Sequence, residues 1–123
     1  MRAFQFATTK NPSNEIVEFL RFTCEFLQLS SIPKIKFVST PIKNVHAVSF
    51  AAFNPDSNQI MMYIKNRHIL DVFRSLAHEM VHYKQSQHRN DLNGSTGSPD
   101  ENEANSVAGQ IMRLYGKTHP ELY

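Results

Sequence analysis

The sequence contains a single cysteine, Cys24, among its 123 residues. One cysteine cannot form an internal disulfide, so the chain is not a disulfide-framed domain, and a zinc knuckle built from four cysteines is excluded as well. A metal ion bound to this chain must therefore be held by His, Asp or Glu side chains. The lack of further cysteines is typical of proteins from a reducing compartment.

Long apolar runs are also missing. No run approaches the roughly 18 residues that a membrane-spanning helix needs. The first ten residues, MRAFQFATTK, lack the apolar centre of a secretory signal. We therefore expect no transmembrane segment, no signal peptide and a cytoplasmic location, in a host cell if the protein is viral.

The chain has no excess of charge of one sign. Its 13 Lys and Arg residues face 11 Asp and Glu residues, which leaves a formal net charge of +2. Because the basic residues form no block beyond Lys65, Arg67 and the stretch 84–89, nucleic acid is not an expected partner. The length suits one domain with one core and is too short for two, so we expect a single domain over residues 1–123.

Hydrophobic periodicity predicts an α+β fold. Apolar residues recur at helical spacing over about residues 12–29 and again over about 68–88 and 100–115, with Gly116 expected to end the last helix. Three short strands are expected in the segments KIKFVST (34–40), HAVSFAAF (46–53) and QIMMYIKN (59–66). The last two strands are separated by turn residues and predict a tight hairpin.

The helix expected over 68–88 carries an HExxH pattern, in the segment LAHEMVHYKQ. His78 and His82 lie one turn apart on the same side of a helix, so both imidazoles can reach one ion. They face away from the apolar stripe of that helix. Glu79 lies to one side, where it can accept a proton from a metal-activated water without taking a ligand position. The pattern predicts a hydrolytic zinc site.

A catalytic zinc site needs a third protein ligand. His88 would complete the longer pattern HExxHxxGxxH, but Gln85 replaces its glycine, and an unbroken helix carries His88 roughly 9 Å along the axis and out of reach. The other candidate is Glu103, which follows His82 by 21 residues on the last helix. Glu101 points nearly the opposite way from Glu103, so only one of the two can face the metal.

Two features bear on the choice between these glutamates. Glu103 shares one side of the last helix with Val107, while Ala104 and Ala108 form a small face that lets two helices approach closely. The attraction of acidic residues to the positive end of a helix accounts for Glu101 without a metal. Helix geometry by itself leaves the choice between the two glutamates open.

The chain resembles the gluzincin branch of the zincin metallopeptidases, because HEMVH is followed about twenty residues later by NEA on a helix. The segments LAHEMVHYKQ and ENEANSVAGQIMRLYG, with the terminal HPELY, are also similar to small zincin-like proteins of tailed phages. The resemblance covers about residues 45–123. It implies a minimal single-domain zincin-like fold and one Zn²⁺ ion held by His78, His82 and Glu103. Lys84 departs from the family pattern, as does the lack of a large lower domain.

The resemblance also implies a mechanism, in which Glu79 is the general base of peptide-bond hydrolysis and later passes the proton to the leaving amine. The expected substrate is a protein or peptide lying extended along an edge strand, here residues 59–66. A donor for the oxyanion is also needed, and the spacing does not choose among four candidates. These are Tyr63, Tyr83, Tyr115 and His119. A further hypothesis is that residues 117–123 fold over the cleft and inhibit the enzyme.

Two other functions fit the pattern. One is a zinc-stabilised binding or assembly protein that has lost hydrolysis, and the other is a zincin-like protease acting on DNA-associated proteins. Glu79 favours a peptidase over the first alternative, because a purely structural site gains nothing from a base and normally closes its fourth position. The second alternative needs a nucleic-acid surface, which the charge pattern does not indicate.

Overall fold

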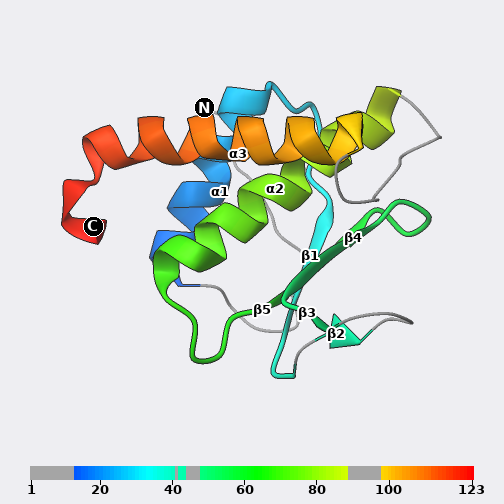
Figure 1. The fold of residues 1–123 in the computed structure, drawn as a ribbon, viewed down its shortest axis with the longest axis horizontal. Helices are drawn as coiled ribbons and strands as arrows, with labels where there is room; N and C mark the ends of the chain where they lie inside the picture. The colour runs from blue at the N-terminus through cyan, green and yellow to red at the C-terminus, as the bar shows by residue number, and fades with distance from the viewer. Residues whose placement is uncertain (1–12, 41, 44–47, 89–97) are drawn as a thin grey trace.

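Three helices gather on one side of a small sheet in the computed structural model (Figure 1). The structure describes residues 13–40, 42–43, 48–88 and 98–123. The helices are α1 (Asn14–Leu27), α2 (Ile69–His88) and α3 (Pro99–Thr118), followed by the short 3-10 helix η1 (Pro120–Leu122). The strands are β1 (Lys34–Val38), β2 (Ile42–Lys43), β3 (Val48–Ser49), β4 (Ala51–Asn54) and β5 (Gln59–Tyr63). The predicted α+β class is confirmed.

The main sheet is mixed, with the order β1-β5-β4. β5 lies in the centre, parallel to β1 and antiparallel to β4. Alternate residues of the two parallel strands, Ile35 and Phe37 in β1 and Ile60 and Met62 in β5, are buried. Because burial alternates from residue to residue, one face of the sheet packs against the core, as the alternation in KIKFV predicts. β2 and β3 form a separate antiparallel pair.

The predicted hairpin joins β4 to β5. Its turn is closed by Asn54, whose side-chain oxygen accepts a hydrogen bond from the Asp56 N–H at 2.9 Å, and Asn58 takes a left-handed conformation with φ 53°. The strand expected over 46–53 is interrupted at Phe50, which separates β3 from β4, and residues 46–47 lie outside the described part. The short strand β2 was not predicted.

Aromatic rings hold the three helices together. Phe19 of α1 stacks on Phe73 of α2 with ring centroids 4.3 Å apart, and Tyr115 of α3 meets both rings edge-on. Cys24 is buried in the same core, and burial raises the pKa of its thiol to about 11. No helix in the described ranges has the length and apolar character needed to cross a bilayer.

The last helix runs two residues past the expected end at Gly116. A Cβ at Gly116 would lie 2.8 Å from the Cε2 atom of Tyr123, so this position must be glycine for the C-terminal ring to pack against the helix. The Tyr123 hydroxyl donates a hydrogen bond to the Met112 carbonyl at 3.2 Å. Gly116 therefore serves a close approach of the C-terminus and does not terminate α3.

Candidate metal centre

Helix α2 brings His78 and His82 together, as the four-residue spacing predicts. Their Nε2 atoms lie 3.2 Å apart, and their ring centroids lie 4.8 Å apart. The two side chains are only 17% and 12% exposed, so they are not simply solvated residues on a wet helix face. Burial lowers the pKa of His78, against the opposing attraction of the Glu101 carboxylate.

Glu101 at the start of α3 completes the cluster. Its Oε1 atom lies 2.8 Å from Nε2 of His78, and its Oε2 atom lies 2.9 Å from Nε2 of His82. The hydroxyl of Ser98 caps α3 by accepting a hydrogen bond from the Glu101 N–H, which fixes the first turn that carries this carboxylate.

The three groups together could hold a metal ion, since their ligand atoms lie within 4.8 Å of one another. Ligand atoms about 2.0–2.1 Å from a tetrahedral zinc ion are roughly 3.3 Å apart. The contacts of 2.8, 2.9 and 3.2 Å among His78, His82 and Glu101 come close to that value. The donor set therefore fits a small tetrahedral cation without a large rearrangement.

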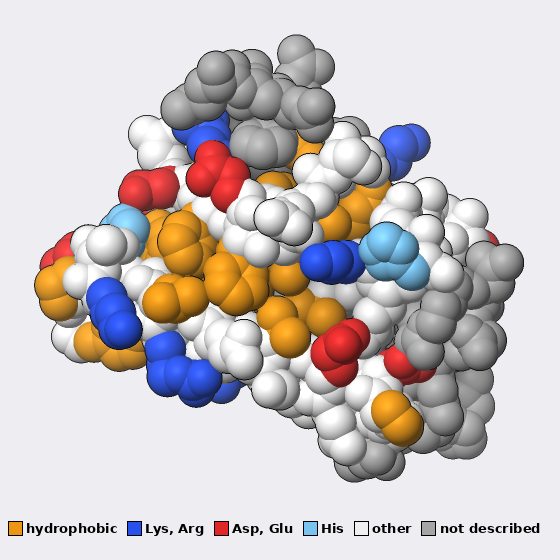
Figure 2. Space-filling model, turned by 90° about the horizontal axis from the view of Figure 1, so that it is seen from above, with side chains coloured by type: hydrophobic (Ala, Val, Ile, Leu, Met, Phe, Trp, Pro, Cys, Tyr) orange, Lys and Arg blue, Asp and Glu red, His pale blue; other side chains and the backbone are white. Residues whose placement is uncertain are grey.

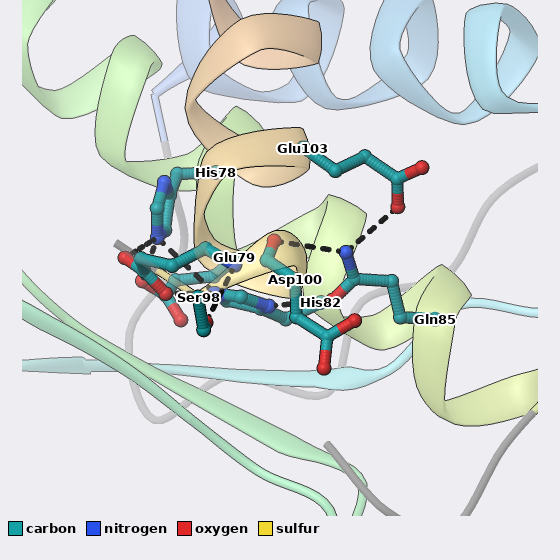
Figure 3. Close-up of polar contacts among 8 residues, drawn as sticks. His78, Glu79, His82, Gln85, Ser98, Asp100 and Glu103 are labelled. Atoms are coloured by element: carbon teal, nitrogen blue, oxygen red, sulfur yellow. Dashed lines mark hydrogen bonds and ion pairs between the residues drawn. The ribbon is translucent and has the colours of Figure 1, made fainter. Parts of the chain in front are cut away.

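Of the two glutamates, the structure brings Glu101 to the histidines and not Glu103, which was the expected third ligand. The side chain of Glu103 accepts a hydrogen bond at 2.7 Å from Gln85, away from the histidine Nε2 atoms (Figure 3). A signal for this existed in the sequence. Glu101 lies three residues before Ala104, on the same stripe of α3 as the buried Ala104 and Ala108, whereas Glu103 is exposed.

Each histidine has a further polar partner. The Nδ1 atom of His82 lies 2.8 Å from Oε1 of Gln85, and the side chain of Asn105 forms a hydrogen bond with His78. Partners of this kind orient metal-binding imidazoles. Asn105 lies four residues after Glu101, so the same face of α3 supplies both the carboxylate and the support for His78.

Asp71 and Ser75 of α2 both bind Arg67. The Arg67 Nε atom donates to Asp71 at 2.8 Å, and Nη2 donates to the Ser75 hydroxyl at 2.6 Å. Nη1 donates to the carbonyl of Tyr63 at 2.6 Å. The side chain of Arg67 is only 6% exposed, so it ties the end of β5 to the first turns of α2.

Glu79 lies beside the cluster and outside its ligand set. Its Oε2 atom is 4.0 Å from Nε2 of His78, and its side chain is 12% exposed. Burial raises the pKa of Glu79 to about 7, although the His82 imidazole and a hydrogen bond from the Phe53 backbone favour the charged form. A carboxyl group with a pKa near neutrality can both accept and release a proton at pH 7.

The prediction that residues 59–66 form an edge strand is wrong. Residues 59–63 form β5, which has a partner on both sides, whereas β4 lies at the edge. The β4 residue Phe53 makes the backbone hydrogen bond to Glu79, so the edge strand beside the cluster is β4.

Three of the four predicted oxyanion donors are engaged elsewhere. The hydroxyls of Tyr83 and Ser31 lie 2.6 Å apart, and Tyr115 packs among the core rings of α1 and α2. His119 lies beyond the far end of α3, roughly 25 Å from Glu101 at the rise of an α-helix. Tyr63 stacks on Phe50 next to β4 and remains the candidate.

The C-terminal segment does not fold over the histidines. His119 stacks on Tyr115 at 3.9 Å and contacts Glu18 of α1 at 2.8 Å, and this hydrogen bond raises the pKa of His119. Tyr123 packs back on Gly116. The tail therefore lies at the opposite end of α3 from Glu101 (Figure 1), and the inhibition hypothesis is wrong for this conformation.

His88, the alternative third ligand, does not join the cluster. It lines a cavity of about 540 Å³ between the three helices, together with apolar residues that include Phe26, Val81 and Val107. Viewed from above, the molecule shows a group of hydrophobic side chains bordered by basic and acidic ones (Figure 2). Gln85 and Glu103 also line this cavity, so the cavity adjoins the metal centre through Gln85.

No protein-family model, no curated protein and no solved structure matches this chain.

Proposed function

We propose that this protein is a zinc-dependent metallopeptidase of the gluzincin type, with His78, His82 and Glu101 as ligands and Glu79 as the general base. The observation that carries the proposal is the Glu101 carboxylate, which lies within 2.9 Å of Nε2 of both histidines while Glu79 stands beside them without joining the set. Two imidazoles and one carboxylate form a donor set of catalytic zinc centres, which keep a fourth position open.

Zinc suits this set because it accepts nitrogen and oxygen ligands in tetrahedral geometry. A zinc ion bound there supplies a nucleophilic water and polarises the carbonyl of the scissile bond. The protein's part is to hold the ligands in place before the substrate arrives. It does so by mounting His78 and His82 on one face of α2 and Glu101 on the capped start of α3.

Glu79 is suited to proton transfer. Its Oε2 atom lies 4.0 Å from Nε2 of His78, beside the proposed ligands and outside their set, where it can reach a water on a bound ion. The Phe53 N–H donates a hydrogen bond to its carboxylate and so fixes its position relative to the ligands. In the proposed reaction Glu79 takes a proton from the attacking water and then delivers it to the leaving amine.

The edge of β4 supports the proposal that the substrate is a peptide. The Tyr63 N–H donates to the Phe50 carbonyl at 2.8 Å, so Phe50 directs its backbone toward β5. Because hydrogen-bonding directions alternate along an antiparallel strand, Ala51 and Phe53 direct their backbone groups away from β5. The Phe53 N–H already donates to Glu79, so the edge offers a peptide both backbone groups of Ala51 and the carbonyl of Phe53. No other strand of the described part pairs with that edge. An extended peptide can add there as a further strand, with its backbone next to Glu79.

The test combines metal analysis with a cleavage assay on a fluorogenic casein and a mixed peptide library. We expect about one zinc per chain and cleavage that a chelator abolishes. Glu79→Gln is expected to keep the zinc and to lose cleavage by about 10³-fold or more, because the base is gone while the ligands remain. Glu18→Gln, on the exposed side of α1, is the matched control and retains cleavage.

The alternative of a zinc-stabilised binding protein predicts a different result. Zinc content would be normal in both proteins, but neither the parent nor Glu79→Gln would cleave any peptide. That result would overturn the proposed peptidase. A parent protein that takes up no zinc would overturn the metal centre itself.

A further inference from the structure

Gln85 connects the two helices that carry the metal ligands (Figure 3). Its side chain is almost fully buried, with 7% of the residue exposed. The Oε1 atom lies 2.8 Å from Nδ1 of His82, while the Nε2 atom donates to the Asp100 carbonyl at 3.0 Å and to the Glu103 carboxylate at 2.7 Å. All the polar atoms of this amide therefore have partners.

These contacts fix which way the amide of Gln85 faces. A backbone carbonyl and a carboxylate can only accept hydrogen bonds, so the group between Asp100 and Glu103 must be the NH₂ group of Gln85. Its oxygen is then turned to Nδ1 of His82, which must carry a hydrogen to donate to it. Nε2 faces the Glu101 carboxylate and donates to it, so a ring that gives up a hydrogen to bind a metal ion loses the one on Nε2 while Gln85 holds the one on Nδ1.

We infer that Glu103 and Gln85 form a relay that holds His82 in its metal-binding tautomer, with Glu103 and Gln85 acting as positioning residues and not as ligands. The inference rests on the proposed metal centre. The negative charge of Glu103 strengthens the hydrogen bond that the Gln85 amide donates to it. The amide held in this way keeps its oxygen toward Nδ1 of His82 and so orients the imidazole. Glu103 thus affects metal binding through Gln85 and His82, although it does not reach the ion.

The relay has a direct spectroscopic signature. ¹H–¹⁵N NMR is expected to show the Nδ1 hydrogen of His82 protected from exchange with solvent, because it donates to the buried amide of Gln85. The protection is expected in the zinc-bound protein, and in the metal-free protein at a pH where both ring nitrogens carry a hydrogen. In Gln85→Met the acceptor is lost, and this hydrogen is expected to exchange faster. Gln85→Glu still offers an oxygen to Nδ1 and is expected to keep the protection. A parent whose Nδ1 hydrogen exchanges as fast as that of Gln85→Met would overturn the inference, whether or not the protein cleaves peptides.

Zinc affinity, measured by competition with a chromophoric chelator, provides the second readout. Loss of a residue that orients a metal ligand typically weakens binding about 10- to 100-fold, and we expect this for Gln85→Met. Glu103→Ala is expected to weaken binding about 10-fold, and Glu103→Gln less, because its amide oxygen still accepts from Gln85. Gln87→Met, on the exposed surface of the same helix, is the matched control and keeps the parent affinity.

The outcomes separate this inference from the proposed function. Parent-like zinc affinity and parent-like protection of the Nδ1 hydrogen in a folded Gln85→Met would overturn the relay and leave the peptidase proposal standing. If the parent binds zinc but cleaves nothing, the peptidase fails while the affinity series still decides the relay. If the parent binds no zinc, the metal centre fails, and the metal-free NMR spectra alone decide whether Gln85 holds the Nδ1 hydrogen of His82. Circular dichroism of each variant identifies any that fail to fold.

Discussion

The assignment of Glu101 as the third ligand can be tested through thermal stability. A ligand that binds only the folded state stabilises it, by about 2.7 kcal/mol when free zinc is at one hundred times its Kd. For a chain of 123 residues, an unfolding entropy of roughly 2.1 cal/mol/K per residue converts 1 kcal/mol into a shift of about 4 °C. We therefore expect zinc at that concentration to raise the Tm of the parent by about 10 °C.

Removing Glu101 and removing Glu103 should have different effects. Glu101→Ala removes a group that touches Nε2 of both histidines, so we expect the affinity to fall about 100-fold or more and the zinc-dependent rise in Tm to shrink to about 2 °C or less. Glu103→Ala disturbs only the contact with Gln85, so we expect a loss of about 10-fold and a rise of about 5 °C.

The assay is differential scanning fluorimetry of each variant, once with free zinc buffered at one hundred times the Kd of the parent and once with a chelator. Comparing the two scans of one variant cancels any effect of the substitution on the metal-free protein. Glu25→Ala, exposed on α1, is the control and should give the parent shift. If Glu103→Ala abolished the shift and Glu101→Ala preserved it, the ligand would be Glu103 and the reasoning from the α2–α3 contacts would be refuted.

Three further predictions concern the rest of the fold. Arg67→Met should lower the free energy of unfolding by about 2 kcal/mol in urea titrations, because it removes the partly buried hydrogen bonds to the Tyr63 carbonyl and the Ser75 hydroxyl; a loss below about 0.5 kcal/mol would contradict this. The thiol of Cys24, with a pKa of about 11, should not react with Ellman's reagent in the folded protein at pH 8 and should react fully in urea. Because the pKa of His119 is raised in the folded protein, the protonated imidazole stabilises the fold at pH values below 6.5, the usual pKa of histidine. This stabilisation is lost as the pH rises through the pKa that His119 has in the folded protein. His119→Gln should therefore be slightly less stable than the parent at pH 5.5 and equal to it at pH 8.5, and the opposite pH trend would refute the contact with Glu18.

The parts of the fold that the sequence predicted are those set by local geometry. The alternation in KIKFV gives β1, and the turn at Asn54–Asn58 gives the β4–β5 hairpin. The edge of the sheet could not be predicted in this way. β1 is separated from β5 by a long connection, and its parallel pairing with β5 buries the strand that had been expected at the edge. Nothing in the residues of either strand alone specifies that pairing.

The choice of the third ligand also depended on packing more than on local sequence. Glu101 and Glu103 are both acidic residues at the start of one helix, and the spacing from His82 suits either. What separates them is the rotation of α3 about its axis, which the Ser98 cap and the burial of Ala104 against the core set together. A prediction that used the buried stripe of α3, which includes Ala104, to judge which side of the helix faces α2 would have favoured Glu101 as the third ligand.

By itself the sequence determined that His78 and His82 share one face of a helix with Glu79 beside them, because the α-helix repeats every 3.6 residues whatever surrounds it. Only the tertiary structure decided which carboxylate meets them, which strand lies at the edge beside Glu79, and that Gln85 bridges α2 to α3. Those three features depend on how elements distant in sequence pack against one another. Side-chain packing across the core settles such arrangements, and local patterns such as the buried stripe of α3 only narrow the choice.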